Sequence, residues 1–357
     1  MNNLKAISLF SGMGGDTLGL HNAGVDVVAY TECNKTYRET HKFNFPNCKC
    51  IGLDVGSDIR KITEEHISEY VNNIDIIFAG FPCQGFSNAG KKKENDPRNT
   101  LFKEFSRFTK IIKPKIIIGE NVKGLLSRKA SSGQFYINII IEEFRQLGYE
   151  CIYKVFKCHE YGIPQKRERL IILGIRNDCL DEFNLEFPSP FNNVDVSLKK
   201  IINFNMMGSI KVEDDEYDIS KIPEQCILTD LDNDENEGVP HPYLKLKAKC
   251  KGGVYNSKTY DSLLSFSKRD SPIHSEIIDI RNPSKTIICT YNYQPRLLVP
   301  LKNKSGFFIR TLLVSELKQI QGFPSTFTIL GTKKEMITQI GNAVPPPLIT
   351  QIVNSFL

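Results

Sequence analysis

Short apolar runs alternate with amphipathic stretches through the first half of the chain. Apolar runs typical of buried strands lie at residues 5–10, 25–31, 74–79 and 115–119. Stretches with helical periodicity lie between them at residues 34–43, 59–71 and 101–112. Strands separated by helices are typical of βαβ units, in which the strands are parallel. The pattern therefore predicts an α/β fold built on a doubly wound, mostly parallel sheet.

The alternation of strands and helices stops near residue 186. Two apolar runs, 152–156 and 170–175, have no helix between them, and we expect them to form an antiparallel pair at one edge of the sheet. From 187 to about 300 helical periodicity is weak, and regularity returns at Phe307 before a last helix after Pro347. We predict a first domain at 1–186, a smaller domain with a hinge at 187–325, and a C-terminal segment, 326–357, that returns to the first domain.

Composition and charge narrow the class of protein. The chain is 40% hydrophobic, and it has neither an apolar run of about 18 residues nor a signal-peptide layout, so we expect no membrane contact. Residues 213–237 hold 11 acidic residues and one lysine, so a net charge of +5 leaves about +15 on the remainder. A basic body suits a phosphate-bearing partner. Ten cysteines without disulfide rhythm or paired zinc spacing predict reduced thiols and no metal.

A glycine-rich segment, SLFSGMGGDTLGL, follows the first predicted strand. Glycines at this place let the chain turn tightly and approach a ligand at the start of the next helix. Glu32 ends the second strand and could bind both hydroxyls of a ribose, and Asp54 lies where a third strand should end. Any adenosine cofactor fits this pattern. The NAD fingerprint is not met, because Thr17 stands where its last glycine belongs, which disfavours a dehydrogenase.

The fourth predicted strand runs into FPCQGFSNAG, which places Cys83 at the carboxyl edge of the sheet. Ligands of open α/β sheets bind beyond this edge. A thiolate is a strong nucleophile, although a lone cysteine is more often a buried core residue. The flanking glycines, proline and glutamine favour a loop. Glu120 follows the next strand, so we expect it beside Cys83.

Six motifs carry a resemblance that covers nearly all of the chain outside 187–284. They are FSGMGG at 10–15, FPCQ at 81–84, ENV at 120–122, QKRER at 165–169, RTLLVSELKQIQGFP at 310–324 and GNAVPP at 341–346. In this order they resemble the C5-cytosine DNA methyltransferase family, and they are similar to its bacterial restriction-modification enzymes. One departure is Asp16, which stands where the family usually has an apolar residue. The resemblance implies a class I S-adenosylmethionine-dependent methyltransferase fold, Rossmann-like, with 187–325 as the target-recognition domain and hinge.

The resemblance also implies the chemistry. Cys83 would attack C6 of a flipped-out cytosine, because C5 becomes nucleophilic enough to accept a methyl group only after such an addition. Glu120 would engage N3 and the exocyclic amine, for which it needs a raised pKa or a shared proton. Arg167 would contact the cytosine O2, Arg169 would be structural or phosphate-facing, and Gln165 would order the loops. The base that removes the C5 proton stays unassigned.

The cofactor implied by the resemblance is S-adenosylmethionine, with S-adenosylhomocysteine as the product. Phe10 would pack on the adenine or methionine side, Glu32 would bind the ribose, Asp54 the adenine and Asn342 the methionine part. Cys33 stands where the family often has a bulkier residue beside the ribose ligand. The full set of expected cofactor contacts is Phe10, Gly12, Gly14, Gly15, Glu32, Cys33, Asp54, Val55, Pro82, Leu101, Asn342 and Ala343.

Double-stranded DNA is the expected partner, with Ser87, Arg98 and Thr286 as candidate contacts. Lysines alternate from 245 to 251, which would place them on one face of an extended segment or in a solvated loop. We expect a monomer in the cytoplasm of a bacterial or virus-infected cell, or in the nucleus of a eukaryotic host, and a cognate restriction endonuclease that acts on the same site. The alternatives are a tRNA cytosine-5 methyltransferase and a non-catalytic DNA-binding member of the family.

Overall fold

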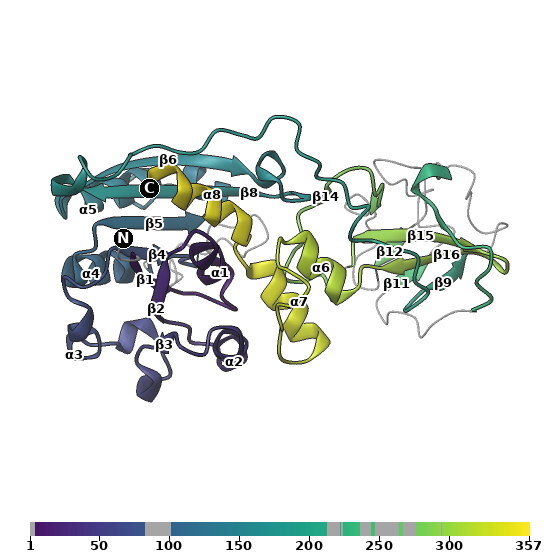
Figure 1. The fold of residues 1–357 in the computed structure, drawn as a ribbon, viewed down its shortest axis with the longest axis horizontal. Helices are drawn as coiled ribbons and strands as arrows, with labels where there is room; N and C mark the ends of the chain where they lie inside the picture. Colours follow the sequence, from purple (N-terminus) through teal and green to yellow (C-terminus); the bar gives the residue numbers. More distant parts are fainter. Residues whose placement is uncertain are drawn as a thin grey trace.

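The computed structural model describes residues 4–82, 101–212, 222, 224–235, 244–246, 264–266, 276–293 and 295–357. A seven-stranded sheet in the order β3-β2-β1-β4-β5-β8-β6 forms the larger of two lobes (Figure 1). Its strands are β1 (Lys5–Leu9), β2 (Asp26–Tyr30), β3 (Lys49–Cys50), β4 (Ile76–Ala79), β5 (Ile116–Asn121), β6 (Tyr149–Lys157) and β8 (Glu168–Arg176). The first five are parallel, and β8 runs antiparallel between β5 and β6. The predicted sheet and its antiparallel pair are confirmed.

Helices cover both faces of this sheet because its strands are apolar on both sides. One face packs on α3 (Glu64–Ile67), α4 (Phe102–Ile112) and α5 (Tyr136–Gln146), the other on α1 (Gly15–Asn22) and α8 (Pro346–Phe356). A further helix, α2 (Lys35–Asn44), joins β2 to β3. The C-terminal helix α8 therefore packs on the first lobe, beside α1. This doubly wound arrangement leaves the carboxyl ends of β1 to β5 at one edge.

One predicted helix is broken. Residues 59–71 form a short 3₁₀ turn (Ile59–Lys61), then α3 and a second 3₁₀ turn (Ser68–Tyr70). Ile62 is extended between the first two, and Thr63 starts α3 with a capping box that includes His66. The cap residue thus restarts the helix where periodicity alone predicts a continuous one.

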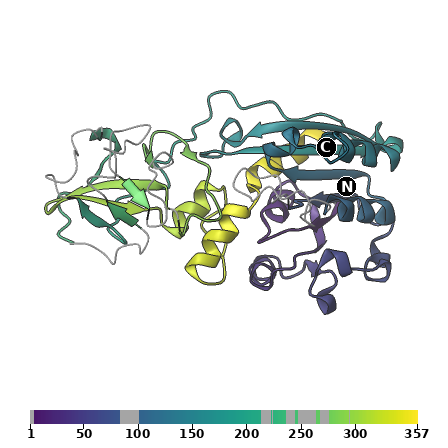
Figure 2. The same ribbon diagram turned by 180° about the vertical axis from the view of Figure 1, so that it is seen from behind.

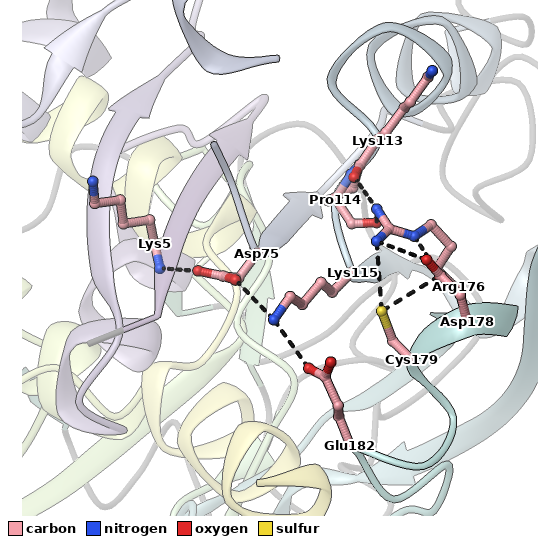
Figure 3. Close-up of polar contacts among 9 residues, drawn as sticks. All are labelled: Lys5, Asp75, Lys113, Pro114, Lys115, Arg176, Asp178, Cys179 and Glu182. Carbon is pink, nitrogen blue, oxygen red and sulfur yellow. Dashed lines mark hydrogen bonds and ion pairs between the residues drawn. The ribbon is translucent and has the colours of Figure 1, made fainter. Parts of the chain in front are cut away.

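The amino-terminal edge of the sheet is closed by polar contacts (Figure 3). The Lys5 amide donates to Asp75 at 2.9 Å, and the Lys115 ammonium lies 3.0 Å from Glu182 and 3.8 Å from Asp75. Arg176, at the end of β8, pairs with Asp178 at 2.6 Å. These pairs are partly exposed, so each contributes little stability. They nevertheless bridge strand ends on this side of the sheet.

The second lobe is a mixed sheet built around the antiparallel pair β15 (Leu297–Asn303) and β16 (Gly306–Thr311). Its other strands are β9 (Ile210–Val212), antiparallel to β16, and β10 (Leu228–Thr229) and β13 (Glu276–Ile277), both parallel to β15. Two short pairs lie outside it. They are β11 (Leu244–Leu246) with β12 (Leu264–Phe266), and β7 (Gln165–Lys166) with β14 (Ser284–Lys285). The short strands match the weak helical periodicity of this region. Near the end of β16, Arg310 forms a buried ion pair with Glu316 through two hydrogen bonds of 2.8 Å, which fixes the corner into α6.

The molecule is elongated, with α6 (Val314–Ile320) and α7 (Lys333–Asn342) between the two lobes (Figures 1 and 2). The two helices share one apolar cluster with strands of the second lobe. The predicted domain boundary at 325/326 falls between them. Across the part of the chain that the structure describes, no helix combines the length and apolarity needed to cross a bilayer.

Candidate active site

The glycine loop leaves β1 and turns directly into α1. Phe10 and Gly12 both have φ of +58°, and Gly14, the N-cap of α1, has φ of +94°. A Cβ added at Gly14 would lie 2.6 Å from the Phe45 ring, and Gly15 packs as tightly against the segment after α7. A Cβ added at Gly12 would meet nothing within 4 Å. The loop is therefore held firmly at Gly14 and Gly15 and is open at Gly12.

Glu32 lies two residues beyond β2 and faces this loop. Its carboxylate accepts hydrogen bonds from the backbone amides of Gly12 at 3.0 Å and Asn34 at 2.7 Å. Burial raises the pKa of Glu32, and the two amide bonds oppose that shift. Each oxygen has a second lone pair, so the carboxylate can still accept from a ligand. Cys33 is exposed beside it.

The third strand is shorter than expected, and this moves Asp54 away from a strand end. β3 ends at Cys50, Gly52 turns the chain with φ of +63°, and Asp54 lies in a 3₁₀ turn, Leu53–Val55. The Asp54 carboxylate is 68% exposed and lies 3.2 Å from the His66 ring, whose hydrogen bond lowers the pKa of Asp54. Val55 is half-buried next to it.

Glu120 lies at the carboxyl end of β5, which is paired in parallel with β4. It is 9% exposed, and one carboxylate oxygen lies 2.7 Å from Nε of Arg169. The next side chain, Asn121, donates to the Phe81 carbonyl at 3.0 Å. This bond ties the ENV motif to FPCQ. Cys83 itself, with Ser87 and Arg98, lies outside the described residues.

Arg167 and Arg169 have different surroundings, although they are two residues apart. Arg167 is 1% exposed, and its guanidinium donates to the carbonyls of Ile287, Gly341 and Ala343 at 3.0 to 3.1 Å. Of these two arginines, it is Arg169 that forms an ion pair with Glu120. The two arginines thus have different partners, and residue 167 lies between β7 and β8 instead of inside a regular strand.

Gln165 belongs to a buried chain of amides. It accepts from the Ile287 amide at 2.9 Å and donates to Gln321 at 2.6 Å, and Gln321 donates to the Ala343 carbonyl at 2.6 Å. Asn342 is exposed, with its amide 3.5 Å from the Tyr37 hydroxyl. These contacts bring the GNAVPP segment next to the QKRER strand.

Three further predicted site residues, Pro82, Leu101 and Thr286, are half-buried or exposed. Pro82 and Leu101 are half-buried at the two ends of the undescribed segment 83–100. Thr286 is exposed, and its hydroxyl donates to the Lys166 carbonyl at 3.0 Å. The edge therefore brings together Gly12 with Glu32, while the Asp54 and Thr286 side chains contact protein groups of their own.

A buried polar chain beneath the glycine loop was not expected from the sequence. Asp16 accepts from the hydroxyls of Ser8 and Ser11, Ser11 contacts Thr17 at 3.1 Å, and Thr17 contacts Nε2 of His41 at 3.0 Å. Burial raises the pKa of Asp16 to about 6 and lowers that of His41 to about 3. One sign was visible in the sequence, since Asp16 stands where the family that the motifs resemble usually has an apolar residue. The partners of Asp16 could be identified only from the folded structure.

The described residues contain no cluster of three or more His, Cys, Asp or Glu side chains arranged to hold a metal ion. The chemistry of the edge is that of a carboxylate, a guanidinium and an open glycine loop. Such an edge can bind a polar ligand and exchange hydrogen bonds with it.

Comparison with known proteins gives a consistent result. A family model described as C-5 cytosine-specific DNA methylase matches residues 4–357. The chain is similar to the type II methyltransferase M.Eco47II of Escherichia coli, with 33% identity over 96% of this chain and 76% of that protein. It is also 32% identical to M.PspPI of a Psychrobacter strain, over 97% of this chain and 77% of that protein.

Solved structures show the same fold at lower identity. A protein described as a DNA modification methyltransferase encoded within an Escherichia coli prophage has a TM-score of 0.64 and 23% identity, covering 99% of this chain and 98% of its own. A mutant of Spodoptera frugiperda DNMT2 has a TM-score of 0.62 and 18% identity, covering 99% of both chains. At such identities the likeness establishes the fold alone. It confirms the predicted α/β class.

Proposed function

The chain belongs to the C-5 cytosine-specific DNA methylase family, and we propose that it methylates C5 of a flipped-out cytosine in a specific duplex DNA sequence through a covalent bond from Cys83 to C6. Membership makes it a DNA (cytosine-5-)-methyltransferase of the type found in restriction-modification systems. Glu120 and Arg169 are assigned from the geometry of the carboxyl edge, and Cys83 is assigned from the FPCQ motif.

The hydrogen bond from Asn121 to the Phe81 carbonyl is the observation that carries this proposal. It binds the end of β5, with Glu120, to the segment that leads through Pro82 into Cys83. Glu120 and the residues that directly precede Cys83 in the sequence thereby meet at one junction between two adjacent parallel strands. A cytosine ring bound at this junction could meet the Glu120 carboxyl group with its N3 while Cys83 attacks C6.

In the proposed reaction the Cys83 thiolate adds to C6 and Glu120 binds N3 and the exocyclic amine. The negative charge that develops on the ring is relieved at N3, and C5 becomes a nucleophilic enamine carbon. After C5 has been methylated, loss of its proton restores the double bond and expels the Cys83 thiolate. A base must be out of the stack for this chemistry, because a stacked ring cannot be reached from its face.

We assign the orienting cation to Arg169 in place of Arg167. Arg169 holds one Glu120 oxygen at 2.7 Å, which fixes the carboxyl group and leaves its other oxygen toward Gly80. Arg167 is enclosed by three backbone carbonyls, so contact with the cytosine O2 would require it to abandon buried partners. Its role is to hold the QKRER strand against the segment around residues 341–343.

The residues present fit S-adenosylmethionine, which supplies the methyl group when bound. The space beside Gly12 is open, whereas protein atoms fill the space beside Gly14 and Gly15. Two backbone amides hold the Glu32 carboxylate in place. Glu32 would hold the ribose hydroxyls, Val55 would pack on the adenine, and Asn342 would face the methionine part. Asp54 would reach the adenine amine if its side chain turned away from His66.

The partners and domains complete the proposal. Duplex DNA binds along the carboxyl edge, residues 187–325 read its sequence, and residues 1–186 with the C-terminal segment 326–357 carry the reaction. Thr286 stands next to the QKRER strand and suits a contact near the extruded nucleotide. The enzyme acts as a monomer, and an endonuclease with the same target site accompanies it.

The test is bisulfite sequencing of DNA from cells that express the wild-type chain or Cys83→Ser. We expect 5-methylcytosine at one recurring sequence with the wild type and none with the variant. Purified Cys83→Ser should still bind S-adenosylhomocysteine in calorimetry with unchanged affinity, which separates lost chemistry from lost folding. Normal methylation by the variant would refute the covalent route.

A further inference from the structure

Arg38, on the second turn of α2, makes an unusual set of contacts next to the proposed cofactor pocket. Its Nη1 donates to the carbonyls of Glu32 and Cys33, both at 2.8 Å, and to the carbonyl of Gly56 at 2.9 Å. Hydrogen bonds from a charged donor are stronger than neutral ones. A single guanidinium therefore gathers three backbone oxygens from two different loops.

These loops form two sides of the proposed pocket. Glu32 and Cys33 follow β2, and Gly56 follows the turn that carries Asp54 and Val55 after β3. A second bond joins the same loops, since the Glu32 amide donates to the Ser57 hydroxyl at 3.1 Å. The ribose side and the adenine side are thus linked through Arg38 and Ser57.

The backbone of the second loop is strained where Arg38 holds it. Gly56 has φ of +72°, and Ser57, which is not a glycine, has φ of +52° and is 1% exposed. The left-handed conformation costs a non-glycine residue free energy and persists only where surrounding contacts impose it. Those contacts are the Arg38 bond to the Gly56 carbonyl, the Ser57 hydroxyl bond and the Ser57 amide bond to the Gly52 carbonyl at 2.6 Å.

We propose that Arg38 is a positioning residue for the adenosine part of S-adenosylmethionine, which clamps the Glu32 loop and the loop 54–57 in their binding conformation without touching the cofactor. This inference rests on the proposed function of the pocket. It goes beyond that function because it assigns cofactor affinity to a residue outside the six motifs. The clamp acts on adenosine, so it affects cofactor and product equally.

Two physical effects of Arg38 must be separated. Its positive charge lowers the pKa of Glu32, against the larger effect of burial, so its loss could act through charge alone. Arg60 provides a matched control, because it is an exposed arginine near the same loop. Its guanidinium pairs with Asp58 at 2.7 Å instead of with the clamped carbonyls. Removing either arginine removes one positive charge, but only Arg38 holds the two loops together.

The experiment measures binding of S-adenosylmethionine, S-adenosylhomocysteine and adenosine by calorimetry to the full chain and to Arg38→Met, Arg38→Lys and Arg60→Met. For Arg38→Met we expect Kd to rise about 10-fold for all three ligands, since a charge-assisted contact set is lost. KM for S-adenosylmethionine should rise by the same factor, with kcat at saturation within about 2-fold. Arg38→Lys should recover part of the affinity, and Arg60→Met should stay within about 2-fold of wild type.

The outcomes are distinct. If the wild-type chain binds none of the ligands, the proposed function fails. If it binds them and Arg38→Met binds equally well, or if Arg60→Met weakens binding as much, the clamp is refuted while the proposed function stands. Circular dichroism checks folding. Should Arg38→Met fail to fold, Arg38→Lys decides, because a rise in Kd of about 3-fold shared by all three ligands supports the clamp and an unchanged Kd overturns it.

Discussion

Asp16 shows how one buried side chain can link the glycine loop to the pH of the solution. Its carboxyl group lies beneath the loop and is held by the hydroxyls of Ser8 and Ser11. Burial raises its pKa to about 6, so the folded protein binds a proton more readily than the unfolded chain does. The Asp16 carboxyl group therefore stabilises the folded protein fully at low pH, and this stabilisation is lost as pH rises through about 6.

Substitution Asp16→Asn should therefore change stability in a pH-dependent way. The variant lacks the titrating group, so its free energy of unfolding relative to wild type should increase by about 1 to 2 kcal/mol between pH 5 and pH 8. Urea denaturation at the two pH values, followed by circular dichroism, measures this. The same substitution at exposed Asp26 is the control. An equal difference between variant and wild type at both pH values would contradict the buried titration.

Single residues were predictable where a strand end fixed them and unpredictable where a loop did. Glu32 lies just beyond β2 and Glu120 lies at the carboxyl end of β5, so the apolar runs alone located both at the carboxyl edge. Asp54 follows a strand of two residues, and its side chain turned toward His66. The three carbonyls that Arg38 gathers come from two loops, and no pattern in the sequence records their convergence.

At the scale of elements, the parallel strands were predictable because burial on both faces makes them continuous apolar runs. The helix expected over 59–71 was not, since the cap at Thr63 overrides the periodicity. The pairing of α1 with α8 was also hidden, because the two helices are more than 300 residues apart in the chain. It depends on Gly19, where an added Cβ would lie 2.6 Å from Cβ of Ile349 and 2.7 Å from the Pro346 carbonyl.

Gly19→Ala should for this reason destabilise the protein, although alanine is the better helix former. Overpacking against α8 should cost about 1 to 3 kcal/mol of unfolding free energy, more than the propensity gain of about 1 kcal/mol. In an Ile349→Gly background the cost should be smaller, because the Cβ that would lie 2.6 Å from the added methyl group is removed. Urea denaturation of the four proteins in this double-mutant cycle gives the coupling energy. Additive effects would show that the helices do not meet at Gly19.

At the scale of the molecule, the sequence predicted two lobes but not how they are joined. The joint is the buried amide chain from Ile287 through Gln165 and Gln321 to the Ala343 carbonyl, with Arg167 beside it. Gln165, Gln321 and Ala343 come from three motifs spread over the chain, and no single motif indicates that they meet. Gln165 of QKRER and Gln321 of the segment 310–324 therefore serve to hold the lobes in one relative position.

Gln321→Met tests this joint, because methionine keeps the shape of the side chain and removes its hydrogen bonds. The variant leaves the Gln165 amide without its acceptor in a fully buried place, which should cost about 1 to 3 kcal/mol of unfolding free energy. Gln319→Met, in the last turn of α6 and half-exposed, should stay within about 0.5 kcal/mol of wild type. The double variant Gln165→Met/Gln321→Met should cost less than the sum of the two single variants, since each single one strands the partner's amide. Equal effects of Gln319→Met and Gln321→Met in urea denaturation would mean that the amide chain does not join the lobes.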